Sequence, residues 1–320
     1  MSGNSLSVIF HGVRGSTPAP GNAMARFGGN TSCVEIRTND QILILDAGTG
    51  IRSLGDNLIT AFGSRPIKAS LVISHTHWDH IQGLPFFAPA YSANNHIRVF
   101  AAKGDRQKVD RGLRNQMDPT HFPVGLEHLT GIRGIEEFNS DDVTLGDFRI
   151  RVAALNHPGG CAGFRIDAAG GSVAYLPDHE PGEENLKLME FAQGVDLLIL
   201  DTQYTESEYV AHRGWGHGCL SASVQFAIGA KARELVIFHH DPSHTDFHID
   251  QMIERGRQLA GTSGLMVSAA SENRNAILFE GATPKLPSLP PFILTPANAV
   301  LPTEKVVFPV EALQPGEAAK

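Results

Sequence analysis

The stretch that decides the fold is His75-Thr76-His77-Trp78-Asp79-His80, which places three histidines and one aspartate within six residues. It directly follows the apolar run over residues 69–74, which is typical of a short β-strand buried on both faces. A strand end fixes the position of the backbone, and an irregular turn after it lets neighbouring side chains point inward together. Imidazole nitrogens and carboxylate oxygens bind Zn²⁺, and also Mn²⁺ or Fe. The stretch therefore predicts a metal site at the end of a strand.

Further residues that can bind metal also follow apolar, strand-like runs. They are Asp46, His157, Asp178 and His239. Each one alone is better explained as a capping aspartate or as a histidine satisfied at the edge of a sheet than as a metal ligand. The same placement in four successive cases favours a common site instead.

The spacing of apolar residues predicts a chain in which strands and helices mix throughout. Strands are expected at residues 6–10, 33–37, 41–45, 69–74, 143–156, 172–176, 195–200, 235–238, 265–268 and 276–279. Helices are expected at residues 218–230 and 245–260, and Thr245 is placed to cap the second. This mixture indicates an α/β protein.

The composition changes near the C-terminus. Eight of the 19 prolines lie between Thr283 and Lys320, a density that excludes helix and sheet interior. We therefore expect a catalytic domain over residues 1–282 and an extended Pro-rich tail over residues 283–320. The apolar clusters at residues 292–294 and 306–308 are candidates for anchoring the tail to the domain or to a second subunit, as in a homodimer.

The net charge of −8 makes the chain a poor candidate for binding long nucleic acids, which are held mainly through phosphate neutralisation by Lys and Arg. The three cysteines show no paired spacing, and the first residues lack the pattern of a secretion signal. No stretch approaches the roughly 20 apolar residues of a membrane helix. We expect a cytoplasmic protein with no membrane span.

With these residues in this order, the sequence resembles the metallo-β-lactamase superfamily, and within it the tRNase Z-like and phosphonate-operon phosphodiesterase-like branch. The resemblance runs from about Leu6 to Glu280. Residues 12–18, 27–32 and 238–244 are similar to a bacterial subgroup of that branch. The resemblance implies an αββα sandwich of two mixed β-sheets flanked by helices.

The resemblance also implies roles for the candidate residues. It assigns two divalent metal ions, most simply Zn²⁺ with Mn²⁺ or Fe as alternatives, to one site of His75, His77 and His157 and another of Asp79, His80 and His239, bridged by Asp178. Asp46 would orient the ligand loop by hydrogen bonds, as metal ligands generally require.

Two departures from tRNase Z bear on the substrate. That family has a His-Glu-Ala-Thr signature where this chain has Leu200-Asp201-Thr202-Gln203, so the acidic position is kept and the histidine is lost. The chain also lacks a long basic arm of the kind that holds tRNA. The family's Gly-His-Ser-Thr element is partly kept in residues 216–219. His217 is therefore a candidate proton donor or phosphate contact, and a surface histidine at a helix start is the alternative.

Other histidines and arginines are weaker candidates. We expect His239 rather than its neighbour His240 to point into the site, with His244 lining the pocket behind the ligands. His248 is expected to be solvated on its helix. Arg14 and Arg26 lie in loops, where an arginine either binds phosphate or is simply solvated.

The leading hypothesis is a hydrolase that cleaves a small or cyclic phosphodiester, because two metals can hold a hydroxide at neutral pH and clamp both oxygens of the reaction. Asp79 would orient that hydroxide, and His217 or a bound water would give a proton to the leaving group. The alternatives are a thioester or lactone hydrolase of the same fold and a tRNase Z-like ribonuclease. A metal-stabilised sensory module fits less well, because a structural site needs only four ligands.

Overall fold

Two seven-stranded sheets form the centre of the computed structural model, which describes residues 5–39, 41–182, 185–272 and 277–280. The first sheet has the order β14 (Ile277–Glu280), β1 (Ser5–Gly12), β2 (Cys33–Thr38), β3 (Gln41–Leu45), β4 (Lys68–Ile73), β5 (His96–Ala101) and β6 (Ile132–Glu137). The second has the order β13 (Met266–Ala269), β12 (Glu234–Phe238), β11 (Leu197–Asp201), β10 (Gly171–Leu176), β9 (Cys161–Ala168), β8 (Phe148–Leu155) and β7 (Asp142–Leu145).

Each sheet is antiparallel in one half and parallel in the other. In the first sheet the pairs from β14 to β3 are antiparallel and those from β3 to β6 are parallel. In the second sheet the pairs from β7 to β10 are antiparallel and those from β10 to β13 are parallel. Parallel strands end at the same edge of a sheet, which is where open α/β sheets bind ligands.

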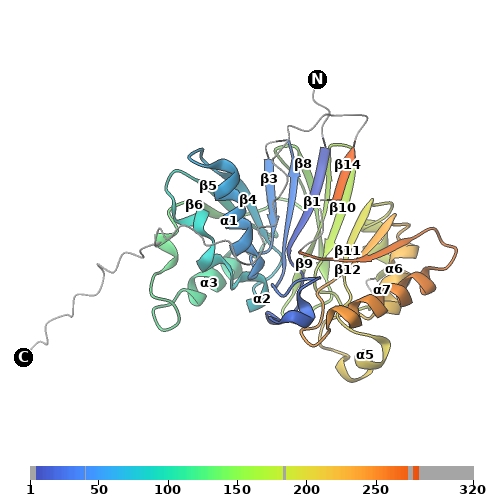
Figure 1. The fold of residues 1–320 in the computed structure, drawn as a ribbon. Helices are drawn as coiled ribbons and strands as arrows, with labels where there is room; N and C mark the ends of the chain where they lie inside the picture. Colours follow the sequence, from blue (N-terminus) through green and yellow to red (C-terminus); the bar gives the residue numbers. More distant parts are fainter. Residues whose placement is uncertain (1–4, 40, 183–184, 273–276, 281–320) are drawn as a thin grey trace, which may run out of the picture. The chain divides into compact units, whose positions relative to one another are not determined.

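Helices cover the outer face of each sheet. Against the first sheet pack α1 (Gly50–Phe62) and α3 (Arg106–Gln116), and against the second pack α4 (Asn185–Phe191), α6 (Leu220–Gly229) and α7 (Asp246–Ala260). Figure 1 shows α1 and α3 beside β4 to β6, with α6 and α7 beside β11 and β12. Two short helices, α2 (Trp78–Ile81) and α5 (Glu206–His212), and one-turn 3-10 helices at Asn22–Met24, Leu84–Phe86, Ala88–Tyr91 and Leu126–His128 complete the described elements.

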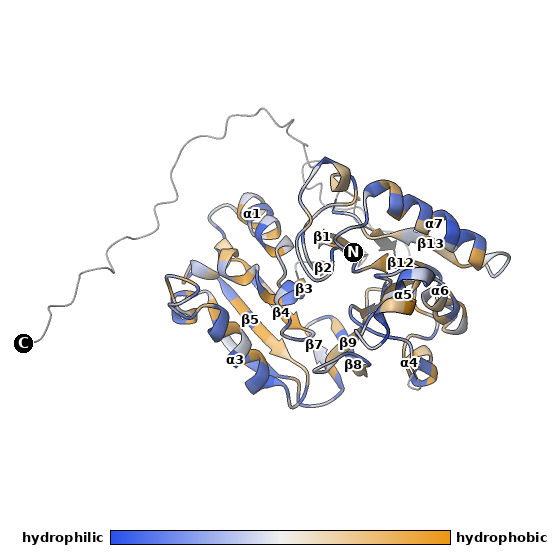
Figure 2. Cartoon of the chain, turned by 90° about the horizontal axis from the view of Figure 1, so that it is seen from below, coloured by the Kyte–Doolittle hydropathy of each residue, from blue (hydrophilic) through white to orange (hydrophobic). Residues whose placement is uncertain are grey.

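The main core lies between the two sheets. The ring of Phe238 on β12 packs against Phe10 on β1 at 6.3 Å and against Tyr175 on β10 at 5.6 Å, measured between ring centroids. Truncating a buried aromatic side chain of this kind costs about 3–5 kcal/mol. Figure 2 shows the complementary pattern, with an apolar β5 inside and a hydrophilic outer face on α7. The arrangement confirms the predicted αββα sandwich.

Most predicted elements are confirmed, including α7, where the Thr245 side chain accepts a hydrogen bond from the amide of His248. One prediction is wrong. The single strand expected over residues 143–156 is a hairpin, in which Leu145 pairs with Phe148 across a two-residue turn. Gly146 begins that turn at φ +62°, a conformation that favours glycine and that ends β7.

The predicted tail over residues 283–320 lies outside the described residues, so the division at residue 282 stays a prediction. Within the described residues, the structure contains no helix that is long and apolar enough to cross a bilayer.

Candidate metal centre

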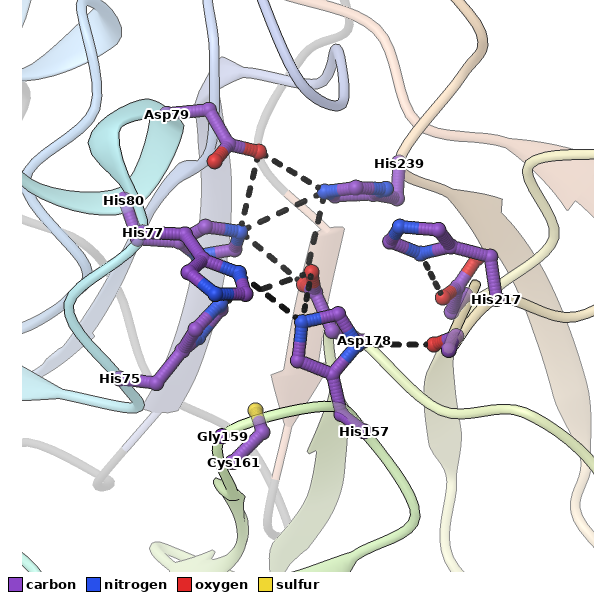
Figure 3. Close-up of polar contacts among 12 residues, drawn as sticks. His75, His77, Asp79, His80, His157, Gly159, Cys161, Asp178, His217 and His239 are labelled. Carbon is purple, nitrogen blue, oxygen red and sulfur yellow. Dashed lines mark hydrogen bonds and ion pairs between the residues drawn. The ribbon is translucent and has the colours of Figure 1, made fainter. Parts of the chain in front are cut away.

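The seven predicted ligands converge at one end of the sandwich, between the two sheets. They form two groups, and within each group the ligand atoms all lie within 4.8 Å of one another. The first group is His75, His77, His157 and Asp178, and the second is Asp79, His80, His239 and Asp178. The loop after β4 and the short helix α2 supply four of these residues, and single residues follow β8, β10 and β12. Figure 3 shows their side chains pointing toward a common centre from both sheets.

Asp178 is the residue that the two groups share. Its Oδ2 lies 3.7 Å from Nε2 of His75 and 3.7 Å from Nε2 of His157. Its Oδ1 lies 3.0 Å from Nε2 of His80 and 3.4 Å from Nε2 of His239. One carboxylate oxygen therefore faces each group, which is the arrangement that a bridging ligand requires.

The buried imidazole nitrogens of the first group are better suited to binding a metal ion than to hydrogen bonding with one another. Nε2 of His75 is buried and has no hydrogen-bond partner among the described residues. Nε2 of His157 lies 3.0 Å from Nδ1 of His77, and burial lowers the pKa of all three imidazoles, which favours the neutral forms that can bind a metal ion through a nitrogen lone pair. An unsatisfied buried nitrogen is costly, and a divalent cation is the partner that such lone pairs lack.

Asp46 fixes the loop that carries the histidines. Its Oδ1 accepts a hydrogen bond from the amide of Ser74 at 2.7 Å. Its Oδ2 accepts three more at 2.8 Å, from Oγ of Ser74, Nδ1 of His80 and the hydroxyl of Tyr175. Because Nδ1 of His80 is engaged behind the site, Nε2 is the nitrogen that faces the centre.

Two other candidate ligands are oriented in the same way. Nδ1 of His157 donates to the carbonyl oxygen of Gly216 at 2.9 Å, and Nδ1 of His239 donates to Oε1 of Gln203 at 3.0 Å. The sequence did not single out Gln203, although it lies two residues beyond the end of β11. Both bonds leave Nε2 of the ring directed at the centre.

Backbone strain is located at two of these positions. Asp46 and His239 adopt φ values of +63° and +60°, which cost a non-glycine residue about 1–3 kcal/mol. Each follows a parallel strand directly, β3 in one sheet and β12 in the other. The sharp turn at each strand end aims the side chain into the space between the sheets.

His217 lies beside the ligands and is paired with a buried acid. Its Nδ1 donates to Oδ2 of Asp201 at 2.8 Å, and its ring stacks on His239 with the centroids 4.8 Å apart. Burial by itself lowers the pKa of His217, but the Asp201 carboxylate outweighs this effect and raises the pKa to about 9. Asp201 is fully buried at the end of β11. Comparison with the tRNase Z signature showed that Asp201 keeps its acidic position, but it did not show that Asp201 pairs with His217.

The weaker candidates lie away from the centre. His244 is buried, and its Nε2 contacts the carboxylate of Glu208 at 3.0 Å. His248 was expected to be solvated, but it is partly buried, with its ring 3.8 Å from that of His244. His240 is directed to the carbonyl oxygen of Ala270, and burial lowers the pKa of His240 to about 3.

The two arginines serve the fold in this structure. Arg14 is fully buried and donates to the carbonyl oxygens of Gly28, Asp241 and His244, so it is not presented to a substrate phosphate. Arg26 is exposed and pairs with Asp250 on α7. Neither alternative that the sequence left open, phosphate binding or a solvated side chain, holds for Arg14, because its guanidinium is buried among backbone carbonyls.

Comparisons with known proteins agree with this geometry. The family model described as "Beta-lactamase superfamily domain" matches residues 42–240. Ribonuclease Z of Thermoplasma acidophilum is 23% identical over 293 residues, covering 76% of this chain and 89% of that protein.

Among solved structures, the metallo-β-lactamase fold protein YhfI from Bacillus subtilis has a TM-score of 0.63 at 21% identity, covering 87% of this chain and 100% of that chain. A diphosphatase from the PhnP family has a TM-score of 0.61 at 17% identity, covering 87% of this chain and 99% of that chain. At these identities the structural likeness shows the fold.

Proposed function

Because the chain belongs to the β-lactamase superfamily, and is by its fold a metal-dependent hydrolase, we propose that it cleaves small or cyclic phosphodiesters at a dinuclear metal centre. The observation that carries this proposal is the position of Asp178, which presents one oxygen to each of two groups of ligand atoms. A single structural ion would need only four closed ligands, and these two groups together comprise seven residues.

His75, His77 and His157 would hold one divalent ion, and Asp79, His80 and His239 would hold the other. Bound ions at these positions supply Lewis acidity toward phosphate oxygens and lower the pKa of water. The donor set contains nitrogen and oxygen atoms and no thiolate, which suits Zn²⁺ and also Mn²⁺ or Fe.

The chain's own residues would orient the water and deliver a proton. Oδ2 of Asp79 accepts a hydrogen bond from the amide of Ser16 at 2.8 Å, which fixes the carboxylate that would orient the attacking water. Asp201 holds Nδ1 of His217, which leaves Nε2 to donate a proton to the departing alkoxide. A positioned acid of this kind typically contributes 10²–10⁴-fold to the rate.

A ribonuclease is the second candidate, because Ribonuclease Z is among the curated relatives. The sequence favours the small substrate, since the chain has a net charge of −8 and carries Leu200 where the tRNase Z signature has histidine. Enclosure of Arg14 removes one expected phosphate contact, so a small diester would be held mainly by the metals and His217.

The test is a substrate panel offered to metal-reconstituted enzyme, with bis-p-nitrophenyl phosphate, cyclic nucleotides, a thioester, a lactone and precursor tRNA. We expect turnover of the small diesters and intact precursor tRNA. Trimming of precursor tRNA that falls steeply with salt, without turnover of small diesters, would establish the ribonuclease instead. Turnover of only the thioester or the lactone would refute phosphodiester chemistry.

A further inference from the structure

Trp215 is exposed and directly precedes Gly216, whose carbonyl oxygen orients the ligand candidate His157. It is one of only two tryptophans in the chain, and 60% of its surface is accessible. The next residue, Gly216, accepts the hydrogen bond from the metal-ligand candidate His157, and the one after it is His217. The large planar side chain of Trp215 is therefore one residue from the carbonyl group that orients His157 and two residues from His217.

The backbone around Trp215 is held on both sides by one carboxylate. Glu180 accepts hydrogen bonds from the amides of Gly214 and Gly216, each at 2.8 Å, and from the hydroxyl of Tyr209 at 3.0 Å. Both glycines adopt positive φ, +85° and +91°. A single exposed apolar residue is ordinary on a protein surface. Trp215 differs because the amides of both neighbouring residues are hydrogen-bonded to Glu180, which holds the backbone at Trp215 in place.

A row of rings connects Trp215 to the site. The rings of His212 and Trp215 form an edge-to-face pair at 4.8 Å and 88°, and His212 in turn stacks on Tyr204 at 4.5 Å and 17°. Tyr204 is buried and packs edge-on against His217 at 6.1 Å. The row supports the inner side of Trp215 and gives the exposed indole a defined place relative to the proton donor.

We propose that Trp215 is a stacking platform for a nucleobase, so that the diester cleaved at the metal centre is a small nucleotide. This proposal rests on the proposed phosphodiesterase function and adds the class of substrate to it. Every nucleobase offers a flat π-face, and stacking on an aromatic side chain strengthens binding without selecting one base. A base joined through its sugar to the scissile phosphate would lie against the indole while the phosphate lies between the ligand groups.

The kinetic test compares two diesters that share a leaving group and differ in the base. Thymidine 5′-(p-nitrophenyl phosphate) carries a base, and methyl p-nitrophenyl phosphate does not. In Trp215→Ala, KM for the thymidine diester should rise at least about fivefold relative to KM for the methyl diester, as expected for a lost base stack. Trp215→Phe keeps an aromatic face and should recover part of that difference.

A change of equal size for both diesters would overturn the proposal and assign Trp215 a structural role. If wild-type enzyme cleaved neither diester, the phosphodiesterase function would fail first, and a binding measurement would then decide the role of Trp215 separately.

That measurement uses intrinsic fluorescence, since the chain has only two tryptophans. In Trp78→Phe, Trp215 is the sole indole, and thymidine 5′-monophosphate should quench it far more strongly than ribose 5-phosphate at equal concentration. In Trp215→Phe the difference between the two ligands should disappear. Equal quenching by both ligands in Trp78→Phe, or a difference that persists in Trp215→Phe, would refute the base platform.

Discussion

Nδ1 of His80 donates a hydrogen bond to Oδ2 of Asp46 at 2.8 Å, across 34 residues of sequence. Both side chains are fully buried, and Asp46 adopts a strained φ of +63° in this position. The bond selects the tautomer of His80 whose Nε2 is free to face Asp178. Asp46, which is not among the candidate metal ligands, thus decides which nitrogen the candidate ligand His80 presents to the centre.

Asp46→Asn should weaken metal binding by about 10–100-fold, the usual effect of losing a group that orients a ligand. The carboxylate accepts four hydrogen bonds, whereas an amide replaces one acceptor oxygen with a donor that faces other donors. Competition with a chelating dye measures the affinity. Tyr175→Phe removes only one of the four bonds and should have a smaller effect. Unchanged affinity in Asp46→Asn would contradict the orienting role.

Asp178→Ala should lower the metal content from two ions per chain toward none, because its two oxygens face both ligand groups. Elemental analysis after reconstitution checks this result. The matched control is His248→Ala, which removes an imidazole next to His244 and Glu208, outside both groups. Full metal content in Asp178→Ala would contradict the bridging role. Loss of an ion in His248→Ala would instead show that the Glu208, His244 and His248 cluster binds metal.

Gly216→Ala should displace His157 and reduce metal content. A Cβ at this position would lie 2.3 Å from Nδ1 of His157 and 2.3 Å from Cδ of Pro158, far inside van der Waals contact. Gly214→Ala is the matched control, because Gly214 has a similar φ of +85° and open space around its Cβ position. Both variants share the cost of a positive φ, so the difference between their metal contents isolates the clash. Equal metal content in the two variants would rule out this account.

The strands and helices found from the sequence are those with a regular apolar pattern. The run over residues 69–74 lies within one residue of β4, and residues 245–260 correspond to α7 with its cap. Helix α1 was not predicted, although Ile51, Leu54 and Leu58 have helical spacing, and Gly55 inside it lowers the helix propensity. A Cβ at Gly55 would lie 2.9 Å from Cδ of Pro89, so the packing of the helix against this loop excludes a larger residue. This packing constraint is visible only in the folded structure and not in the sequence.

Strand β6 was missed for a different reason. Its residues, Ile132–Glu137, are half-buried or exposed, as befits the edge of a sheet, and carry no continuous apolar run. The strand is held by parallel pairing with β5, a contact between segments more than 30 residues apart. Sequence patterning detects strands by their burial, and an edge strand is only partly buried.

The ligand candidates were predictable because each follows an apolar run, whereas the residues that hold them were not. Gln203 contacts His239 across 36 residues of sequence, and Glu180 contacts Gly214 across 34. Gln203 lies in the segment matched to the tRNase Z signature, but nothing in the sequence indicates that its partner is His239. The topology of the second sheet brings these segments together, so only the fold identifies them as partners.

Removal of the His217 side chain should slow cleavage more for leaving groups of higher pKa, which need a proton to depart. Asp201 holds the ring through Nδ1, so Nε2 is the atom that can donate to the departing oxygen. For a nucleoside alkoxide, His217→Ala should lower kcat by about 10²–10⁴-fold, the range for a positioned general acid. For p-nitrophenolate, which leaves without a proton, the loss should be much smaller.

Asp201→Asn should show the same dependence more weakly, because the imidazole remains but loses its charged partner. Rates for a series of diesters with leaving groups of graded pKa measure this slope directly. An equal loss for good and poor leaving groups in His217→Ala would show that His217 only positions His239, on which its ring stacks.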